Sequence, residues 1–143
     1  MKKLIVLGLI LFMTIGGYSQ GKKTPLEGAW KQVGYDKQFI TDTSRQAMIK
    51  NGQIKTFSRE YFTFVGHFEG DTSSYESYGA GTYTLNGDKY EETIIYHNLK
   101  DLIGKKYKSF DKVRNDTLFH TGQVDDDWKL MKGSGTEIYV RLK

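Results

Sequence analysis

The stretch Leu26-Glu27-Gly28-Ala29-Trp30-Lys31 decides the fold of this 143-residue chain. It opens a series of short segments in which apolar and polar residues alternate, and the series ends at Glu137-Ile138-Tyr139-Val140-Arg141. An alternation with a period of two, interrupted by turn residues roughly every 8–12 positions, is typical of an all-β sandwich or barrel. The only proline, Pro25, precedes the first segment, so nothing interrupts the predicted strands.

Eight segments have this strand pattern. They are Glu27–Tyr35, Gly52–Ser58, Tyr61–Phe68, Gly79–Leu85, Lys89–His97, Lys105–Val113, Thr117–Gly122 and Thr136–Leu142. Neighbouring segments form hairpins, of which the one around Asn86-Gly87-Asp88 has the clearest turn sequence. We therefore predict an eight-stranded antiparallel up-and-down barrel, because closure removes exposed edge strands. An open sandwich of the same strands is the alternative.

Three longer connections separate the predicted hairpins. Thr41–Asn51 is expected to contain a short helix and to act as a lid at the open end of the barrel. Asn98–Gly104 is expected to form one or two helical turns, with Asn98 as the cap and Gly104 as the stop. Gln123–Gly135 is expected to be a polar loop.

The first 20 residues have the three-part pattern of a secretory signal peptide. Met1-Lys2-Lys3 is positively charged, Leu4–Ile15 is apolar, and small residues follow as far as Ser19. We predict a signal peptide over 1–20 and a barrel domain over 26–143, with export to the periplasm or the exterior and no stable membrane insertion after cleavage. An uncleaved anchor is the alternative.

The composition narrows the possible functions. Removal of Lys2 and Lys3 from the 21 basic residues leaves 19 against 17 acidic residues, so the mature chain is only weakly basic and no nucleic-acid partner is expected. The absence of cysteine excludes thiol catalysis and thiolate metal sites. Three histidines on separate strands have no metal-ligand spacing, so neither a metal nor another cofactor is expected.

The chain resembles the lipocalin-like (calycin) domains of small secreted bacterial proteins. Leu26–Lys31 matches their L-x-G-x-W opening, Gly81–Leu85 followed by Tyr90–Tyr96 resembles their middle strands, and Glu137–Arg141 resembles their closing strand. The resemblance implies an eight-stranded calycin barrel that is plugged at one end by Trp30, with Arg141 packed over the indole ring.

Strand alternation divides each segment into an inward and an outward face. The predicted ligand-binding residues are Phe62, Phe64, Tyr83, Glu92, Tyr96, His120 and Tyr139. The face of the last strand that carries Tyr139 and Arg141 is placed inward on the strength of the resemblance. Glu92 and Tyr96 are the expected polar anchors, so Glu92→Gln is expected to change ligand affinity more than folding.

These observations predict a barrel that binds a small apolar or amphipathic molecule in its cavity. A filled barrel that acts as a protein-interaction or inhibitor module is the alternative. A second alternative is a small isomerase-like or cyclase-like enzyme in which Glu92 is paired with Tyr96, Tyr83 or His120. No catalytic residue is assigned, since no nucleophile, phosphate-loop or zinc-helix motif is present.

Overall fold

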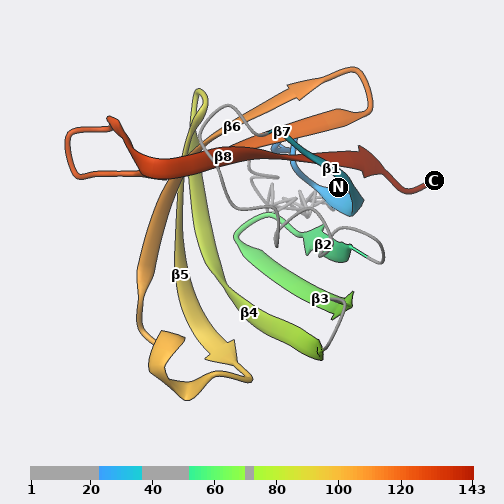
Figure 1. Ribbon diagram of the computed structural model, residues 1–143. Helices are drawn as coiled ribbons and strands as arrows, with labels where there is room; N and C mark the ends of the chain where they lie inside the picture. Colours follow the sequence, from blue (N-terminus) through green and yellow to red (C-terminus); the bar gives the residue numbers. More distant parts are fainter. Residues whose placement is uncertain (1–22, 37–51, 70–72) are drawn as a thin grey trace, which may run out of the picture.

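The chain forms a closed antiparallel barrel of eight strands joined in sequence order (Figure 1). The computed structural model describes residues 23–36, 52–69 and 73–143. The strands are β1 (Gly28–Asp36), β2 (Gln53–Phe57), β3 (Tyr61–Glu69), β4 (Ser74–Asn86), β5 (Lys89–His97), β6 (Lys106–Arg114), β7 (Thr117–Val124) and β8 (Leu130–Arg141). Pairing of β1 with β8 closes the sheet, which confirms the predicted up-and-down barrel over the open sandwich.

Two strands begin earlier than the sequence suggests. β4 starts at Ser74 because its first residues pair with the end of β3, where Glu69 lies opposite Ser74. β8 starts at Leu130, opposite Val124, so the predicted loop 123–135 is mostly strand. The remaining turn is tight because Asp125 Oδ1 accepts hydrogen bonds from the backbone N–H groups of Asp127 and Lys129.

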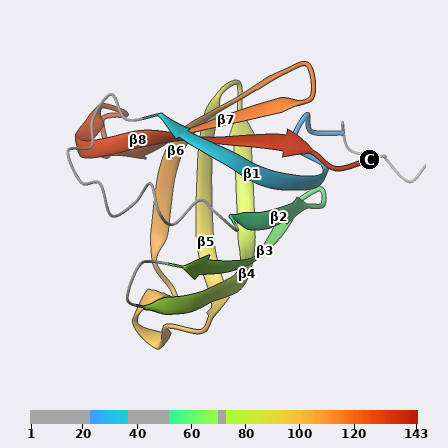
Figure 2. The same ribbon diagram turned by 45° about the vertical axis from the view of Figure 1, so that its right-hand side comes forward.

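The two ends of the barrel have different connections. The β4–β5 and β6–β7 hairpins turn through only two residues each, and Gly87 and Asn115 there adopt positive φ angles of 66° and 53°. Such angles suit glycine and asparagine. In an up-and-down barrel alternate connections lie at opposite ends, so the β5–β6 and β7–β8 connections share the other end. Figures 1 and 2 show the β5–β6 connection far from the C-terminus.

The 3₁₀-helix η1 (Lys100–Leu102) is the only helix in the described part of the chain. Asn98 does not cap it, because its side chain instead holds β4: Nδ2 donates to the Glu76 carbonyl and Oδ1 accepts from the Tyr78 N–H. Gly104 follows the helix with a positive φ of 83°. The predicted helix and lid at 41–51 lie outside the described residues. No helix among those described is long and apolar enough to cross a membrane.

The core fills the end of the barrel that holds the two-residue turns. Its largest fully buried side chains are Trp30, Tyr90, Tyr139, Phe62, Leu26 and Leu118. The Trp30 indole N–H donates to the Leu26 carbonyl at 2.6 Å. The guanidinium carbon of Arg141 lies 4.0 Å from the centre of the Trp30 ring, and Arg141 also donates to the carbonyls of Glu27 and Pro25. These contacts tie the two ends of the sheet together and plug this end.

Candidate functional site

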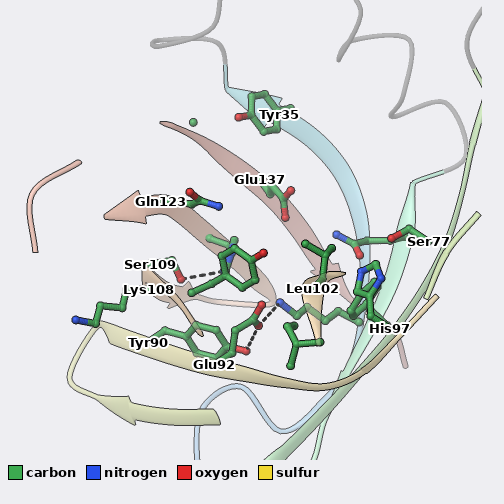
Figure 3. Close-up of a pocket in the computed structure, with 18 of the residues that line it drawn as sticks. Tyr35, Ser77, Tyr90, Glu92, His97, Leu102, Lys108, Ser109, Gln123 and Glu137 are labelled. Carbon is green, nitrogen blue, oxygen red and sulfur yellow. Dashed lines mark hydrogen bonds and ion pairs between the residues drawn. The ribbon is translucent and has the colours of Figure 1, made fainter. Parts of the chain in front are cut away.

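A cavity of about 330 Å³ lies above the plug (Figure 3). Its lining comes from all eight strands and from η1: Tyr35, Gln53, Lys55, Phe64, Phe68, Tyr75, Ser77, Tyr90, Glu92, Ile94, His97, Leu102, Tyr107, Lys108, Ser109, His120, Gly122, Gln123, Gly135 and Glu137. Tyr35, Phe68 and Leu102 belong to the longer connections or to the strand ends beside them. The cavity therefore opens at the end opposite Trp30.

Three of the predicted ligand-binding residues line this cavity, namely Phe64, Glu92 and His120. Three others lie beneath it in the plug: Phe62, Tyr83 and Tyr139 are at most 4% exposed and pack with the core. They support the cavity floor instead of bordering the open space. The inward direction of Tyr139 shows that β8 turns its polar face, not its apolar one, to the interior.

The placement of Tyr96 is corrected by the structure. Its side chain is 58% exposed on the outside of the barrel, stacked on Tyr78. The pairing of β4 with β5 shifts between Ala80 and Gly81, so that Ala80 lies opposite Tyr96 while Gly81 lies opposite Ile94. A β-bulge of this kind inserts one residue and reverses the alternation beyond it. His97 therefore points inward in place of Tyr96.

The floor of the cavity contains a buried ion pair. Lys55 Nζ lies 3.1 Å from Glu92 Oε2, and the Tyr90 hydroxyl donates to the same oxygen at 2.7 Å. The Lys55 ammonium is also within 5.5 Å of the ring centres of Phe57, Phe62 and Tyr90. Burial lowers the pKa of Lys55, but Glu92 and the more distant Asp111 and Glu137 outweigh it and raise the pKa, so Lys55 is a cation.

A second pair lies beside the first. His120 Nδ1 is 2.8 Å from Asp111 Oδ1, which also accepts the Ser109 hydroxyl at 2.7 Å. Burial lowers the pKa of His120, but the charge and hydrogen bond of Asp111 outweigh it and raise the pKa above its ordinary value. Asp111 Oδ2 is buried without a hydrogen-bond partner among the described residues.

The third carboxylate of the cavity, Glu137, has a different environment. Its Oε2 accepts a 2.5 Å hydrogen bond from the Tyr139 hydroxyl, which in turn accepts from Gln53 Nε2 at 2.6 Å. Burial and the nearby Glu137 raise the pKa of Tyr139 well above its ordinary value, so its hydroxyl stays a donor. No basic side chain in the described residues forms an ion pair with Glu137.

The walls nearer the mouth are apolar. Phe64, Phe68, Ile94, Leu102 and Tyr107 supply them. His97 joins this wall with its ring centre 5.5 Å from that of Phe64. Burial lowers the pKa of His97, and its Nδ1 accepts the Leu99 N–H, so this histidine is neutral at pH 7. The site thus combines a charged floor with a largely uncharged wall.

Four residues of the site were not predicted from the sequence, namely Gln53, Lys55, Asp111 and Glu137. In β2 the apolar face would be chosen as inward, yet Ile54 is 40% exposed and Lys55 only 6%. The available signal was the spacing of two between Lys55 and Phe57, which places the ammonium on the same face as a core aromatic ring. Glu137 likewise shares the inward face of β8 with Tyr139.

The arrangement defines the class of protein as a closed eight-stranded antiparallel β-barrel with an internal cavity. No family model matches the chain, and no curated protein matches it significantly. In the described residues no group of three or more histidine, aspartate or glutamate side chains is placed to hold a metal ion.

The partners of Glu92 bear on the enzymatic alternative. That alternative pairs Glu92 with Tyr96, Tyr83 or His120 around an empty space. The hydrogen bonds of Glu92 go instead to Lys55 and Tyr90. The structure therefore does not show the pairing of Glu92 that this alternative requires.

Proposed function

We propose that this protein binds a small amphipathic molecule, without covalent attachment, in the cavity of its barrel. The observation that carries the proposal is the cavity of about 330 Å³ with a charged floor and apolar walls. Small-molecule sites have volumes of roughly 300–1,000 Å³, mostly apolar linings and a few converging polar groups. The apolar body of the ligand lies against Phe64, Phe68 and Leu102, and its polar end reaches the floor.

The resemblance to small secreted bacterial lipocalin-like domains supports the same proposal. An exported carrier is the role that this resemblance and the signal-like residues 1–20 suggest together. The open space above the plug counts against the filled-barrel interaction module, because that alternative needs side chains to occupy the interior.

Native mass spectrometry of the protein purified from its own host tests the proposal. A bound small molecule that is released on denaturation supports it, and its mass begins to identify the ligand. The neutral dye N-phenyl-1-naphthylamine provides a second readout, because its fluorescence rises in apolar surroundings. A clean apo mass together with no dye enhancement would overturn the proposal.

A matched pair of variants locates the binding site. Ser77 lines the cavity, whereas Ser74 is exposed on the opposite face of the same strand, so the same substitution can be made inside and outside. Ser77→Trp is expected to weaken dye binding at least about tenfold by filling the cavity. Ser74→Trp is expected to leave dye binding unchanged. Equal effects of the two variants would place the dye elsewhere.

A further inference from the structure

We propose that the cavity selects amphipathic amines, with the protonated amino group of the ligand paired to Glu137. This inference rests on the proposed function, since it names the chemical class of the ligand. It follows from the way in which charges are distributed over the cavity floor, and from one carboxylate in particular.

Among the described lining residues, every basic side chain except the neutral His97 is already paired with a carboxylate. Lys55 is bound to Glu92 at 3.1 Å, and His120 to Asp111 at 2.8 Å. Lys108, at the rim, donates to Asp126 at 2.8 Å. An anionic ligand would therefore have to compete with a carboxylate that is already in place for each of these cations.

Glu137 is the exception among the carboxylates. It lines the cavity and is half-buried, and its hydrogen-bond donor is the uncharged hydroxyl of Tyr139. Figure 3 shows Glu137 and Glu92 on facing sides of the pocket. Because a partly buried carboxylate is stabilised by a cation at hydrogen-bond distance, a ligand ammonium at Glu137 supplies what the described residues do not.

The charge balance of the whole floor points the same way. Three carboxylates, Glu92, Asp111 and Glu137, act on two basic groups, Lys55 and His120. Among the described residues of the floor, one negative charge is left over even with both basic groups protonated. A monovalent ammonium neutralises that charge, whereas a carboxylate ligand would increase it.

The walls also suit an alkyl or aryl amine. Aromatic rings predominate among the apolar lining side chains and belong to Tyr35, Phe64, Phe68, Tyr75, Tyr90 and Tyr107. Ring faces attract cations, most strongly away from water, and they also pack against an apolar chain. The same surface thus accommodates both parts of an amphipathic amine.

Three probes of equal chain length separate the charge effect from the apolar effect. Decylamine, decanol and decanoate are titrated into the purified protein at pH 7 by isothermal titration calorimetry, below the concentrations at which they form micelles. We expect decylamine to bind about tenfold more tightly than decanol, because a hydrogen-bonded charge pair is worth about 1.4 kcal/mol or more. Decanoate should bind more weakly than decanol.

Variants assign the preference to Glu137. Glu137→Gln removes the charge and keeps an oxygen that can accept the Tyr139 hydroxyl, so it should abolish the preference for decylamine over decanol. Glu137→Asp keeps the charge and should keep the preference. Glu91→Gln is the matched control, because Glu91 pairs with Lys106 outside the cavity lining and its loss should change nothing.

The outcomes separate this inference from the proposed function. Equal or tighter binding of decanol or decanoate by the unchanged protein overturns the amine selectivity, and so does a preference that survives Glu137→Gln. If none of the three probes binds but the neutral dye does, the proposed selectivity for amines is overturned, and the cavity remains a binding site. If neither the probes nor the dye binds, both proposals fall.

Discussion

Lys55 and Glu92 form an ion pair of 3.1 Å inside the barrel, with only 8% and 12% of their side chains exposed. Loss of one partner leaves the other charged and largely desolvated, which typically costs about 3–5 kcal/mol. Glu92→Gln is therefore expected to reduce the free energy of unfolding by about 3 kcal/mol, measured by urea denaturation. This reverses the expectation from sequence that Glu92→Gln would mainly change affinity.

The double variant Lys55→Met/Glu92→Leu tests the explanation. Apolar residues of similar size often replace a buried ion pair without loss of stability. The double variant is thus expected to be more stable than either single variant, and the coupling energy between the two sites should exceed about 1 kcal/mol. If the losses in the free energy of unfolding from the two single substitutions simply add, Lys55 and Glu92 are not coupled and the explanation is wrong.

The plug makes a prediction about Arg141. Its guanidinium lies over the Trp30 ring and donates to the carbonyls of Glu27 and Pro25. An ammonium cannot make this planar set of contacts, so Arg141→Lys is expected to lower the free energy of unfolding by about 1–2 kcal/mol. Lys143→Met is the control. Arg141 Nε and Lys143 Nζ lie 3.4 Å and 3.9 Å from the Asp116 carboxylate, but the Lys143 side chain is 87% exposed, so its loss should be nearly neutral. Similar effects of the two variants would argue against the plug contacts.

The pair of His120 and Asp111 predicts a pH dependence of stability. The pKa of His120 is raised in the folded state. The stabilisation that the charged imidazole gives the fold is therefore fully present below about pH 6.5, the ordinary pKa of histidine, and is lost as the pH rises through the pKa of the folded state. The difference in unfolding free energy between the unchanged protein and His120→Gln should therefore shrink from about pH 5.5 to pH 8.

That difference isolates one histidine, because the other two histidines are present in both proteins. The groups that act on the imidazole are Asp111 and Ser109 through hydrogen bonds, and Lys55 and Glu137 through charge. Burial and Lys55 oppose protonation of the imidazole, but Asp111 and Glu137 outweigh them and raise the pKa of His120, so the difference is expected to shrink as the pH rises. A difference that grows with pH would show that His120 is neutral in the fold.

The bulge at the end of β5 depends on Gly81. A Cβ at this position would overlap the Thr93 carbonyl oxygen and lie 2.7 Å from the Phe62 ring. Gly81→Ala should therefore destabilise the fold by about 2 kcal/mol or more. Gly34→Ala is the matched control, because its Cβ would meet Ile138 at an ordinary 3.6 Å and should change the stability by less than about 0.5 kcal/mol. Thermal unfolding of the two variants compares them directly.

The fold was predictable because its signals are local. The alternation of apolar and polar residues predicted eight strands, and Asn86-Gly87 predicted the turn between β4 and β5. The site was less predictable because it depends on contacts between strands. The bulge depends on the pairing of β4 with β5 and cannot be recognised from the sequence of β5 alone, so Tyr96 was assigned to the wrong face. The inward position of Lys55 depends on Glu92, 37 residues away in sequence.

The plug has a practical consequence for attaching this protein to a surface. Arg141 donates to Pro25, and the Leu142 N–H donates to the Ala29 carbonyl, so residues near both ends of the barrel domain lie at the plugged end. A tether at Lys143 would hold the domain with its mouth directed away from the support. Immobilised sensors and affinity columns made from this barrel would thus keep the cavity accessible without any redesign of the connections around its entrance.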